Sequence, residues 1–282
     1  MKAKKSAKKW LGQNFLKSEI ALRKIVEAGE IKSDDIILEI GPGRGALTEK
    51  LLEKAGTVIA VEKDYELFEF LKIKFSNQIK ANTLILVCED ILDFEIESPH
   101  YKVIANIPYN ITGAILKKFL GGSDQPESMI LMVQHEVARR IMAADGKESV
   151  LSISVKAYGE PKLVMKVGAR YFSPAPKVDS AVIAIKNISR KLFIENLKTV
   201  QSRTLHSSLH SLSVEEFEDR FWQIVKAGFA HKRKKLSGNL KNVIFGEKNG
   251  QGPSLGAFSD KRAEDLSLLD WILLTKKDII DS

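Results

Sequence analysis

Short apolar runs alternate with segments of helical periodicity from the first residues to about residue 188. Alternation of this kind is typical of βαβ units, in which helices join the parallel strands of one sheet. The sequence therefore predicts an α/β domain. Its predicted strands cover residues 35–40, 56–61, 83–88, 101–105, 128–133, 150–158, 162–167 and 179–185, and its predicted helices cover residues 18–27, 46–55, 65–77 and 136–143.

The pattern changes near residues 187–190, and only helical periodicity follows. We expect a domain boundary there. The predicted domains are residues 1–188, with an α/β fold, and residues 189–282, a smaller all-helical domain. Helices are predicted over residues 192–210, 214–227, 232–245 and 262–274.

The composition favours a polyanionic partner. The chain has 282 residues, 44% of them hydrophobic, and a formal net charge of +8. A net positive charge is common among proteins that bind nucleic acid. Residues 1–11 contain several lysines and no acid, which indicates a basic arm without the apolar stretch of a secretory signal.

The sequence argues against a membrane protein and against disulfides. No apolar run approaches the roughly 20 residues that span a bilayer. Cys88 is the single cysteine, so no internal disulfide can form. We expect a monomer in a reducing, cytoplasmic setting. Because Cys88 ends an apolar run, we also expect a buried structural thiol.

A glycine-rich loop follows the first predicted strand of the sheet. Gly41 and Gly43 permit a tight turn and close approach of the backbone to a ligand. Glu62 ends the next strand, where a carboxylate can accept both hydroxyls of a ribose. This arrangement also fits the NAD fingerprint G-x-G-x-x-G/A. With Glu39 before it and Gly45 at its end, the loop reads E-x-G-x-G-x-G, which resembles the first motif of S-adenosylmethionine methyltransferases. Asp90 after the third strand could accept a hydrogen bond from an adenine amino group.

The fourth strand ends in Asn106-Ile-Pro-Tyr109. This tetrad brings a side-chain carbonyl, backbone carbonyls and a flat ring to one point. Such a set suits an exocyclic amine whose base stacks on the ring. The tetrad is similar to the [N/D/S]-[I/P/L]-P-[Y/F] motif of methyltransferases that modify amino groups of nucleic-acid bases. An ordinary strand-end turn is the alternative.

With these residues in place, nearly the whole chain resembles the ribosomal RNA adenine dimethyltransferases of the KsgA type. The resemblance implies a Rossmann-like, S-adenosylmethionine-dependent methyltransferase sheet and a helical RNA-recognition domain. The motifs that carry it are Gly12–Leu16, Glu39–Thr48, Val61–Asp64, Glu89–Asp90, Asn106–Thr112, Gln134–Arg140, Phe172–Ser180, Gly228–Leu236 and Lys261–Ser267.

The resemblance also implies roles for individual residues. Tyr109 and Phe172 would stack on the two faces of the target base. Without the resemblance, Phe172 would be interpreted as a core aromatic. The substrate would be two adjacent adenosines near the 3′ end of small-subunit (16S) rRNA, in the immature 30S subunit. The cofactor S-adenosyl-L-methionine would be held by Asn14, Leu16, Gly41, Glu62, Asp90 and Asn106.

We hypothesise that the Asn106 side-chain oxygen and the Pro108 carbonyl accept the two N–H groups of the adenine amine. The nitrogen would then turn toward sp³ and aim its lone pair at the methyl group. No dedicated general base is required, and no cluster of residues has metal-ligand spacing.

Three basic segments are the predicted RNA contacts: the N-terminal arm, Arg139–Arg140 and His231–Lys235. The last of these departs from the Arg-Arg-Lys that relatives often carry, although its charge survives at Lys232–Lys235.

Three other functions remain compatible with the sequence. An NAD-dependent oxidoreductase fits the glycine loop and Glu62 but leaves the tetrad unexplained. A non-catalytic rRNA-binding assembly factor would share the fold. An Erm-type enzyme would modify an adenosine of the large-subunit rRNA instead.

Overall fold

The structure is a computed structural model that describes residues 14–203, 212–241, 243 and 255–281. The predicted basic arm lies outside these residues. The chain divides into two compact units. Unit 1 comprises Met1–Met142 and Gly159–Ile188, and unit 2 comprises Ala143–Tyr158 and Ser189–Ser282. The change at residues 188 and 189 coincides with the predicted boundary, but residues 143–158 group with the helical unit.

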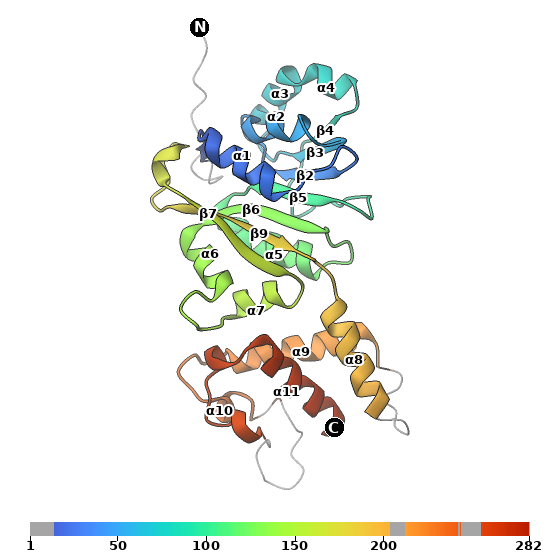
Figure 1. The fold of residues 1–282 in the computed structure, drawn as a ribbon, viewed down its shortest axis with the longest axis vertical. Coiled ribbons are helices and arrows are strands. Elements are labelled where there is room, and N and C mark those ends of the chain that lie inside the picture. Colours follow the sequence, from blue (N-terminus) through green and yellow to red (C-terminus); the bar gives the residue numbers. More distant parts are fainter. Residues whose placement is uncertain (1–13, 204–211, 242, 244–254, 282) are drawn as a thin grey trace. The chain divides into compact units, whose positions relative to one another are not determined.

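Unit 1 is built on a sheet that has seven strands among the residues described (Figure 1). Their order is β4-β3-β2-β5-β6-β9-β7. The first five are parallel, whereas β9 runs antiparallel to both β6 and β7. The strands are β2 (Ile36–Ile40), β3 (Thr57–Val61), β4 (Leu84–Val87), β5 (Lys102–Asn106), β6 (Ser128–Gln134), β7 (Glu160–Val167) and β9 (Ser180–Lys186).

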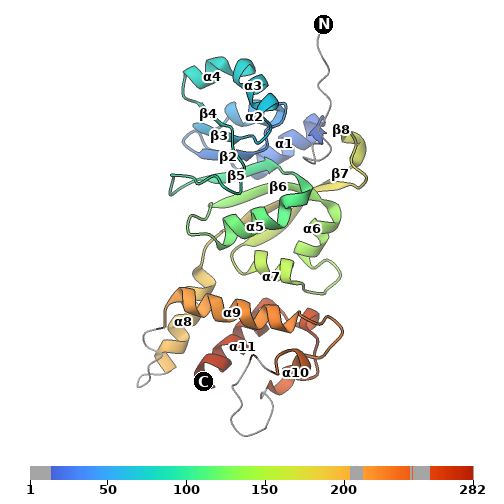
Figure 2. The ribbon, with the colours of Figure 1, turned by 180° about the vertical axis from the view of Figure 1, so that it is seen from behind.

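Helices cover both faces of this sheet. Figures 1 and 2 show α1 and α5 on opposite faces. Strands covered on both sides are buried throughout, which explains why the central strands read as continuous apolar runs. Ser18 caps α1 by accepting a hydrogen bond from the Ala21 N–H at 3.2 Å. The helices of unit 1 are α1 (Glu19–Ala28), α2 (Ala46–Leu52), α3 (Tyr65–Lys74), α4 (Ser76–Lys80), α5 (Thr112–Gly121) and α6 (His135–Met142).

The register of the parallel strands brings their carboxyl ends to one edge. Ile40 lies opposite Val61, and Val61 lies opposite Val87. From β2 the chain continues to β3 and β4 on one side of β2 and then crosses to β5 on the other side. The direction of strand order therefore reverses at β2. Ligands of open α/β sheets bind at such a switch point. The fold therefore gathers the ends of β2, β3, β4 and β5 into one candidate site.

A second, two-stranded sheet joins distant parts of the sequence. β1 (Phe15–Leu16) pairs antiparallel with β8 (Phe172–Ser173), so that Phe15 faces Ser173 and Leu16 faces Phe172. The Lys17 N–H adds a hydrogen bond of 2.8 Å to the Tyr171 carbonyl. Two motifs that lie far apart in the sequence therefore meet.

Unit 2 is helical and packs around aromatic side chains. Phe193, Phe217, Phe221 and Trp271 are fully buried. Its helices are α7 (Val150–Lys156), α8 (Lys191–Arg203), α9 (Val214–Gly228), α10 (Leu236–Asn239) and α11 (Leu268–Asp281). α10 is much shorter than the helix predicted over residues 232–245, part of which lies outside the described residues.

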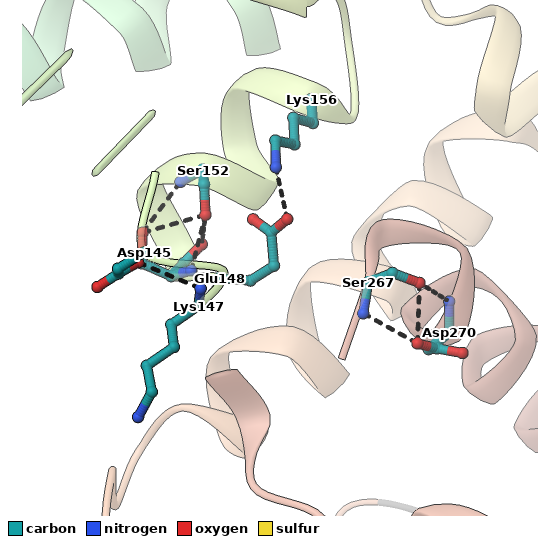
Figure 3. Close-up of polar contacts among 8 residues, drawn as sticks. Asp145, Lys147, Glu148, Ser152, Lys156, Ser267 and Asp270 are labelled. Carbon is teal, nitrogen blue, oxygen red and sulfur yellow. Dashed lines mark hydrogen bonds and ion pairs between the residues drawn. The ribbon is translucent and has the colours of Figure 1, made fainter. Parts of the chain in front are cut away.

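The strand predicted over residues 150–158 is wrong, because this segment forms α7. Ser149 and Ser152 form a capping box: the Ser149 hydroxyl accepts from the Ser152 N–H at 3.1 Å, and the Ser149 N–H donates to the Ser152 hydroxyl at 2.7 Å. Figure 3 shows Ser152 and the ion pair of Lys156 with Glu148 at this helix. Capping and burial of Ile153 and Val155 override the strand propensity of β-branched residues.

The expectation of a buried Cys88 is also wrong, because its side chain is exposed. β4 is the outer strand at one side of the main sheet, and Cys88 follows its last residue. An apolar run indicates burial only where neighbouring elements cover both sides. No helix was predicted for the segment after β5, where the structure has a 3₁₀ turn (Tyr109–Ile111) and α5.

Candidate active site

A cavity of about 480 Å³ opens at the carboxyl ends of β2–β5 in unit 1. The residues around it come from the glycine loop, the ends of β3 and β4, the tetrad after β5, and the β1–β8 sheet. Every residue predicted to hold the cofactor is among them. The lining includes Asn14, Phe15, Leu16, Lys17, Glu39, Gly41, Gly43, Glu62, Asp90, Asn106, Pro108, Tyr109 and Ser173.

The glycine loop comes close to the cavity because its glycines adopt left-handed backbone conformations. Gly41 and Gly43 have φ angles of +63° and +61°. A Cβ on Gly43 would lie 3.0 Å from two ring carbons of Phe15. The Gly41 N–H donates to the Val61 carbonyl at 2.9 Å, which ties the loop to the end of β3. A side chain at either position would strain the loop or displace Phe15.

Glu62 is held rigidly at the end of β3. One carboxylate oxygen accepts from the Gly43 N–H at 3.0 Å, and the other accepts from the Asp64 N–H at 2.9 Å. The side chain is buried, and burial raises its pKa above the usual range. Each oxygen keeps a lone pair for a further donor. This geometry fits a carboxylate that receives two ribose hydroxyls.

Glu39 is buried even more deeply, with 1% exposure. Its Oε2 atom has no hydrogen-bond partner among the residues described. Burial raises the pKa of Glu39 to about 8, and the nearby charge of Glu62 acts in the same direction. An unpartnered carboxyl oxygen in a cavity wall is costly unless a donor arrives. The ammonium group of a bound S-adenosylmethionine is such a donor, so the site fits this cofactor.

Asp90 is a polar residue of the cavity lining that follows the end of β4. Its Oδ1 atom accepts from the Leu92 N–H at 3.1 Å, and Lys63 forms an ion pair with Oδ2. The hydrogen bond from Lys63 holds the pKa of Asp90 below its ordinary value. Leu67 and Ile91, both buried, also line the cavity. Neither apolar residue was predicted to line a site, because in the sequence their only signal is a position close to Asp64 and Asp90.

The tetrad is anchored to the N-terminal segment. The Asn106 side-chain amide donates from Nδ2 to the Asn14 carbonyl at 3.2 Å. Because a backbone carbonyl can only accept, the Asn106 amide must turn its NH₂ group toward Asn14. Its Oδ1 atom then accepts no hydrogen bond from the part of the chain that is described. The Pro108 carbonyl accepts from the Ile111 N–H at 3.3 Å and keeps a second lone pair.

Tyr109 is fixed from the other side of the cavity. Its hydroxyl forms a hydrogen bond with the hydroxyl of Ser180, the fully buried first residue of β9. Burial raises the pKa of Tyr109, so the phenol stays neutral. In the sequence Ser180 is only the last residue of the Phe172–Ser180 motif, and its contact with Tyr109 is visible only in the structure.

Phe172 is buried in the core and is not among the residues that line the cavity. Its side chain is 2% exposed and belongs to the core cluster that contains Leu16 and Leu22. The cavity is lined by Ser173 instead. In this conformation Phe172 is a core aromatic, and its stacking role stays a prediction.

The predicted RNA-binding residues are exposed where they are described. Arg139 and Arg140 lie on α6 in unit 1, and His231–Lys235 follow α9 in unit 2. No group of His, Cys, Asp or Glu in the described residues could hold a metal ion. Within the same residues, no helix is long and apolar enough to cross a membrane.

Comparisons with known proteins agree with this geometry. Residues 4–221 match the family model described as ribosomal RNA adenine dimethylase. The chain is 39% identical over 277 residues to the ribosomal RNA small subunit methyltransferase A of Dehalococcoides mccartyi (strain CBDB1), covering 94% of this chain and 86% of that protein.

Two solved structures are also similar. A dimethyladenosine transferase from Plasmodium falciparum superposes with a TM-score of 0.73 and 26% identity, covering 92% of this chain and 95% of the other. The 23S rRNA methyltransferase ErmE gives a TM-score of 0.70 and 25% identity over 94% of this chain and 100% of the other.

Proposed function

The chain belongs to the ribosomal RNA adenine dimethylase family, and we propose that it dimethylates the N6 amines of two adjacent adenosines near the 3′ end of small-subunit rRNA. The methyl donor in this proposal is S-adenosyl-L-methionine. The observation that carries the proposal is the tetrad: Asn106 and Tyr109 are each fixed by a hydrogen bond at the rim of a cavity whose other end holds Glu39 and Glu62.

When bound, S-adenosylmethionine supplies an electrophilic methyl group next to its sulfonium. The protein must then prepare the nucleophile, because the lone pair of an adenine amine is delocalised into the ring. Asn106 Oδ1 and the Pro108 carbonyl accept the two N–H groups and favour an sp³ nitrogen. Positioning of two bound reactants provides most of the rate enhancement.

No side chain is required as a general base in this mechanism. The nitrogen gains the methyl group as the carbon–sulfur bond breaks, and the resulting cationic amine releases its proton to water. Asn106 suits this step because a neutral amide accepts N–H groups without removing a proton in advance. Tyr109 packs against the base, and its neutral hydroxyl stays bound to Ser180.

The similarity to ErmE supports a second substrate, an adenosine of the large-subunit rRNA. The curated relative is more similar in sequence and is named for the small subunit, so we favour the small-subunit substrate. We further propose a monomeric, cytoplasmic enzyme acting on the immature 30S particle. The oxidoreductase alternative loses its support, because family membership and the tetrad together favour methyl transfer.

Asn106→Ala tests the proposal. Removing a preorganised hydrogen-bonding group from an active site lowers kcat by about 100-fold to 1,000-fold. We expect a loss of this size in methyl transfer to small subunits isolated from a strain that lacks the enzyme. Asn77→Ala is the control, because Asn77 is an exposed residue of α4 that does not line the cavity. Wild-type turnover by Asn106→Ala would exclude the assigned role.

A second measurement separates catalysis from a role in assembly alone. Primer extension across both rRNAs from the deletion strain should show loss of two adjacent dimethyladenosines near the small-subunit 3′ end. Loss of a single large-subunit modification would favour the ErmE-like substrate. Unchanged rRNA would favour a non-catalytic assembly factor.

A further inference from the structure

We propose that Tyr171, together with Arg170, forms a stacking platform for an RNA base next to the target adenosine. The inference rests on the proposed function, because it concerns how the RNA strand approaches the same cavity. Tyr171 is 40% exposed, so part of its ring is open to a ligand.

The backbone places Tyr171 next to residues that line the cavity, although its own side chain is not part of the lining. Its carbonyl accepts a hydrogen bond of 2.8 Å from the N–H of Lys17, which lines the cavity. Ser173, two residues further along, lines the cavity as well. Phe172 between them is extended, with φ −115° and ψ 160°. Because an extended residue turns its neighbours to the opposite side, Tyr171 and Ser173 point away from the core that receives Phe172.

Arg170 and Gly168 hold the tyrosine ring in place. The Arg170 guanidinium carbon lies 5.0 Å from the ring centroid, and its Nη2 donates to the Tyr171 hydroxyl at 3.2 Å. A Cβ on Gly168 would lie 3.8 Å from two ring carbons, so the ring also passes close to this backbone. The Tyr171 N–H donates to the Gly168 carbonyl at 3.0 Å. The exposed ring therefore sits on a fixed turn.

The charge of the rim matches a nucleic-acid strand. Lys17 and Arg44 line the same cavity, and the exposed Arg170 adjoins it. By contrast, the interior of the cavity carries Glu39, Glu62 and Asp90. Phosphates therefore meet cations at the rim, and the cationic cofactor meets acids inside.

A neighbouring base needs a new surface when the target base leaves the stack. Enzymes that modify bases extrude the target nucleotide into a pocket and break its stacking. Aromatic and guanidinium planes are the surfaces on which single-stranded bases stack. Tyr171 with Arg170 offers both within one turn. Stacking recognises any base, so this platform would position the strand rather than read its sequence.

The test compares Tyr171→Ala with Tyr171→Phe and Tyr171→Trp. Stacking of one base changes affinity by about fivefold to 100-fold when the aromatic residue is removed. We expect Tyr171→Ala to raise the Kd for unmethylated small subunits by such a factor, measured with S-adenosylhomocysteine present. Tyr171→Phe and Tyr171→Trp should stay within about threefold of the wild type. Phe70→Ala is the matched control, because Phe70 is 41% exposed and neither it nor the two residues on either side of it line the cavity.

The affinity for S-adenosylhomocysteine alone separates stacking from a structural role. A stacking residue leaves this affinity unchanged, and Tyr171→Ala should match the wild type. Equal loss of cofactor and RNA affinity would mean that Tyr171 only supports β1, and would overturn the platform. Wild-type RNA affinity in Tyr171→Ala would overturn it as well.

The same measurements distinguish the two proposals. If the wild-type protein binds small subunits without methylating them, the proposed function fails while the binding comparison still decides the platform. If the wild-type protein methylates them and Tyr171→Ala binds and methylates equally well, only the platform fails.

Discussion

The two ends of the candidate-site cavity differ in the charge of the residues that line them. At the end formed by β2, β3 and β4, acids are gathered, and two of them, Glu39 and Glu62, are buried. At the end formed by β5, Asn106 and Tyr109 are neutral and are held by neutral partners. A cationic cofactor requires the first arrangement. A weakly nucleophilic amine requires the second, in which acceptors orient N–H groups without adding charge.

The two ends also differ in how they are supported. Glu62 accepts hydrogen bonds from the backbone N–H groups of Gly43 and Asp64, which lie 19 and 2 residues away in the sequence. Asn106 and Tyr109 depend on residues far away in the sequence, Asn14 and Ser180. We therefore expect substitutions at the acidic end to affect cofactor binding, and substitutions at the neutral end to affect methyl transfer.

The largest effect is expected for Glu62→Ala. A hydrogen bond to a charged group contributes about 1.5–3 kcal/mol, and this carboxylate would lose two from the ribose. The Kd for S-adenosylhomocysteine should rise by about 100-fold or more in isothermal titration calorimetry. Glu27→Ala, an exposed acid on α1, is the control. A change below about threefold would exclude the proposed ribose contact.

Glu39 should make stability depend on pH. Burial raises its pKa from 4.5 to about 8, so between these values the folded protein holds a proton that the unfolded chain has released. Stability from this group is therefore present below pH 4.5 and is lost as the pH rises toward 8, by up to about 1.4 kcal/mol per pH unit. Chemical denaturation from pH 5.5 to 8 should show a steeper loss of stability in the wild type than in Glu39→Gln, which keeps the contribution of Glu62, whose pKa burial also raises.

The exposed Glu136→Gln provides the comparison for that titration. It should keep the slope of the wild type. Identical slopes in the wild type and in Glu39→Gln would mean that Glu39 is already ionised in the folded protein.

Ser180→Ala should have a smaller effect. This effect should be on methyl transfer, because Ser180 supports Tyr109 at the neutral end of the cavity. A neutral hydrogen bond contributes about 0.5–1.5 kcal/mol, so kcat/KM for methyl transfer should fall about twofold to tenfold. Tyr109→Phe should behave alike, and the double variant should lose no more than either single one, because both remove one bond. Cofactor affinity should not change. Additive losses would show that Ser180 acts independently of Tyr109.

The smallest effect is expected for Lys63→Met. The Lys63 side chain is 59% exposed, and exposed ion pairs contribute less than about 1 kcal/mol. The affinity for S-adenosylhomocysteine should change less than about fivefold, whereas Asp90→Ala should weaken binding more. A larger loss in Lys63→Met than in Asp90→Ala would assign the cofactor contact to the lysine.

The sequence pattern predicted the central strands well because they are largely buried between the helices on both faces of the sheet. The runs at residues 35–40, 56–61 and 128–133 became β2, β3 and β6 with small changes at their ends. The same reasoning failed for residues 150–158, where a short alternating run fits either period and a serine cap selects the helix. It failed again at Cys88, because an apolar run cannot reveal that its strand lies at the side of a sheet.

The candidate site was predictable where chemistry sits on successive strand ends. Glu39, Gly41, Glu62, Asp90 and Asn106 all follow from motif spacing, and the structure brings them around one cavity. The sequence left Phe172 open between a core aromatic and a base-stacking residue, because its motif does not say which side of β8 its ring occupies.

The sequence by itself determined the parallel sheet, the order of the strand-end residues and the resemblance to adenine dimethyltransferases. These depend on local periodicity and on spacing along the chain. Only the tertiary structure decided that Asn14 orients Asn106, that Ser180 holds Tyr109 and that Tyr171 stays at the rim while Phe172 enters the core. Each of these contacts depends on strand register and pairing between distant segments, which no local pattern encodes.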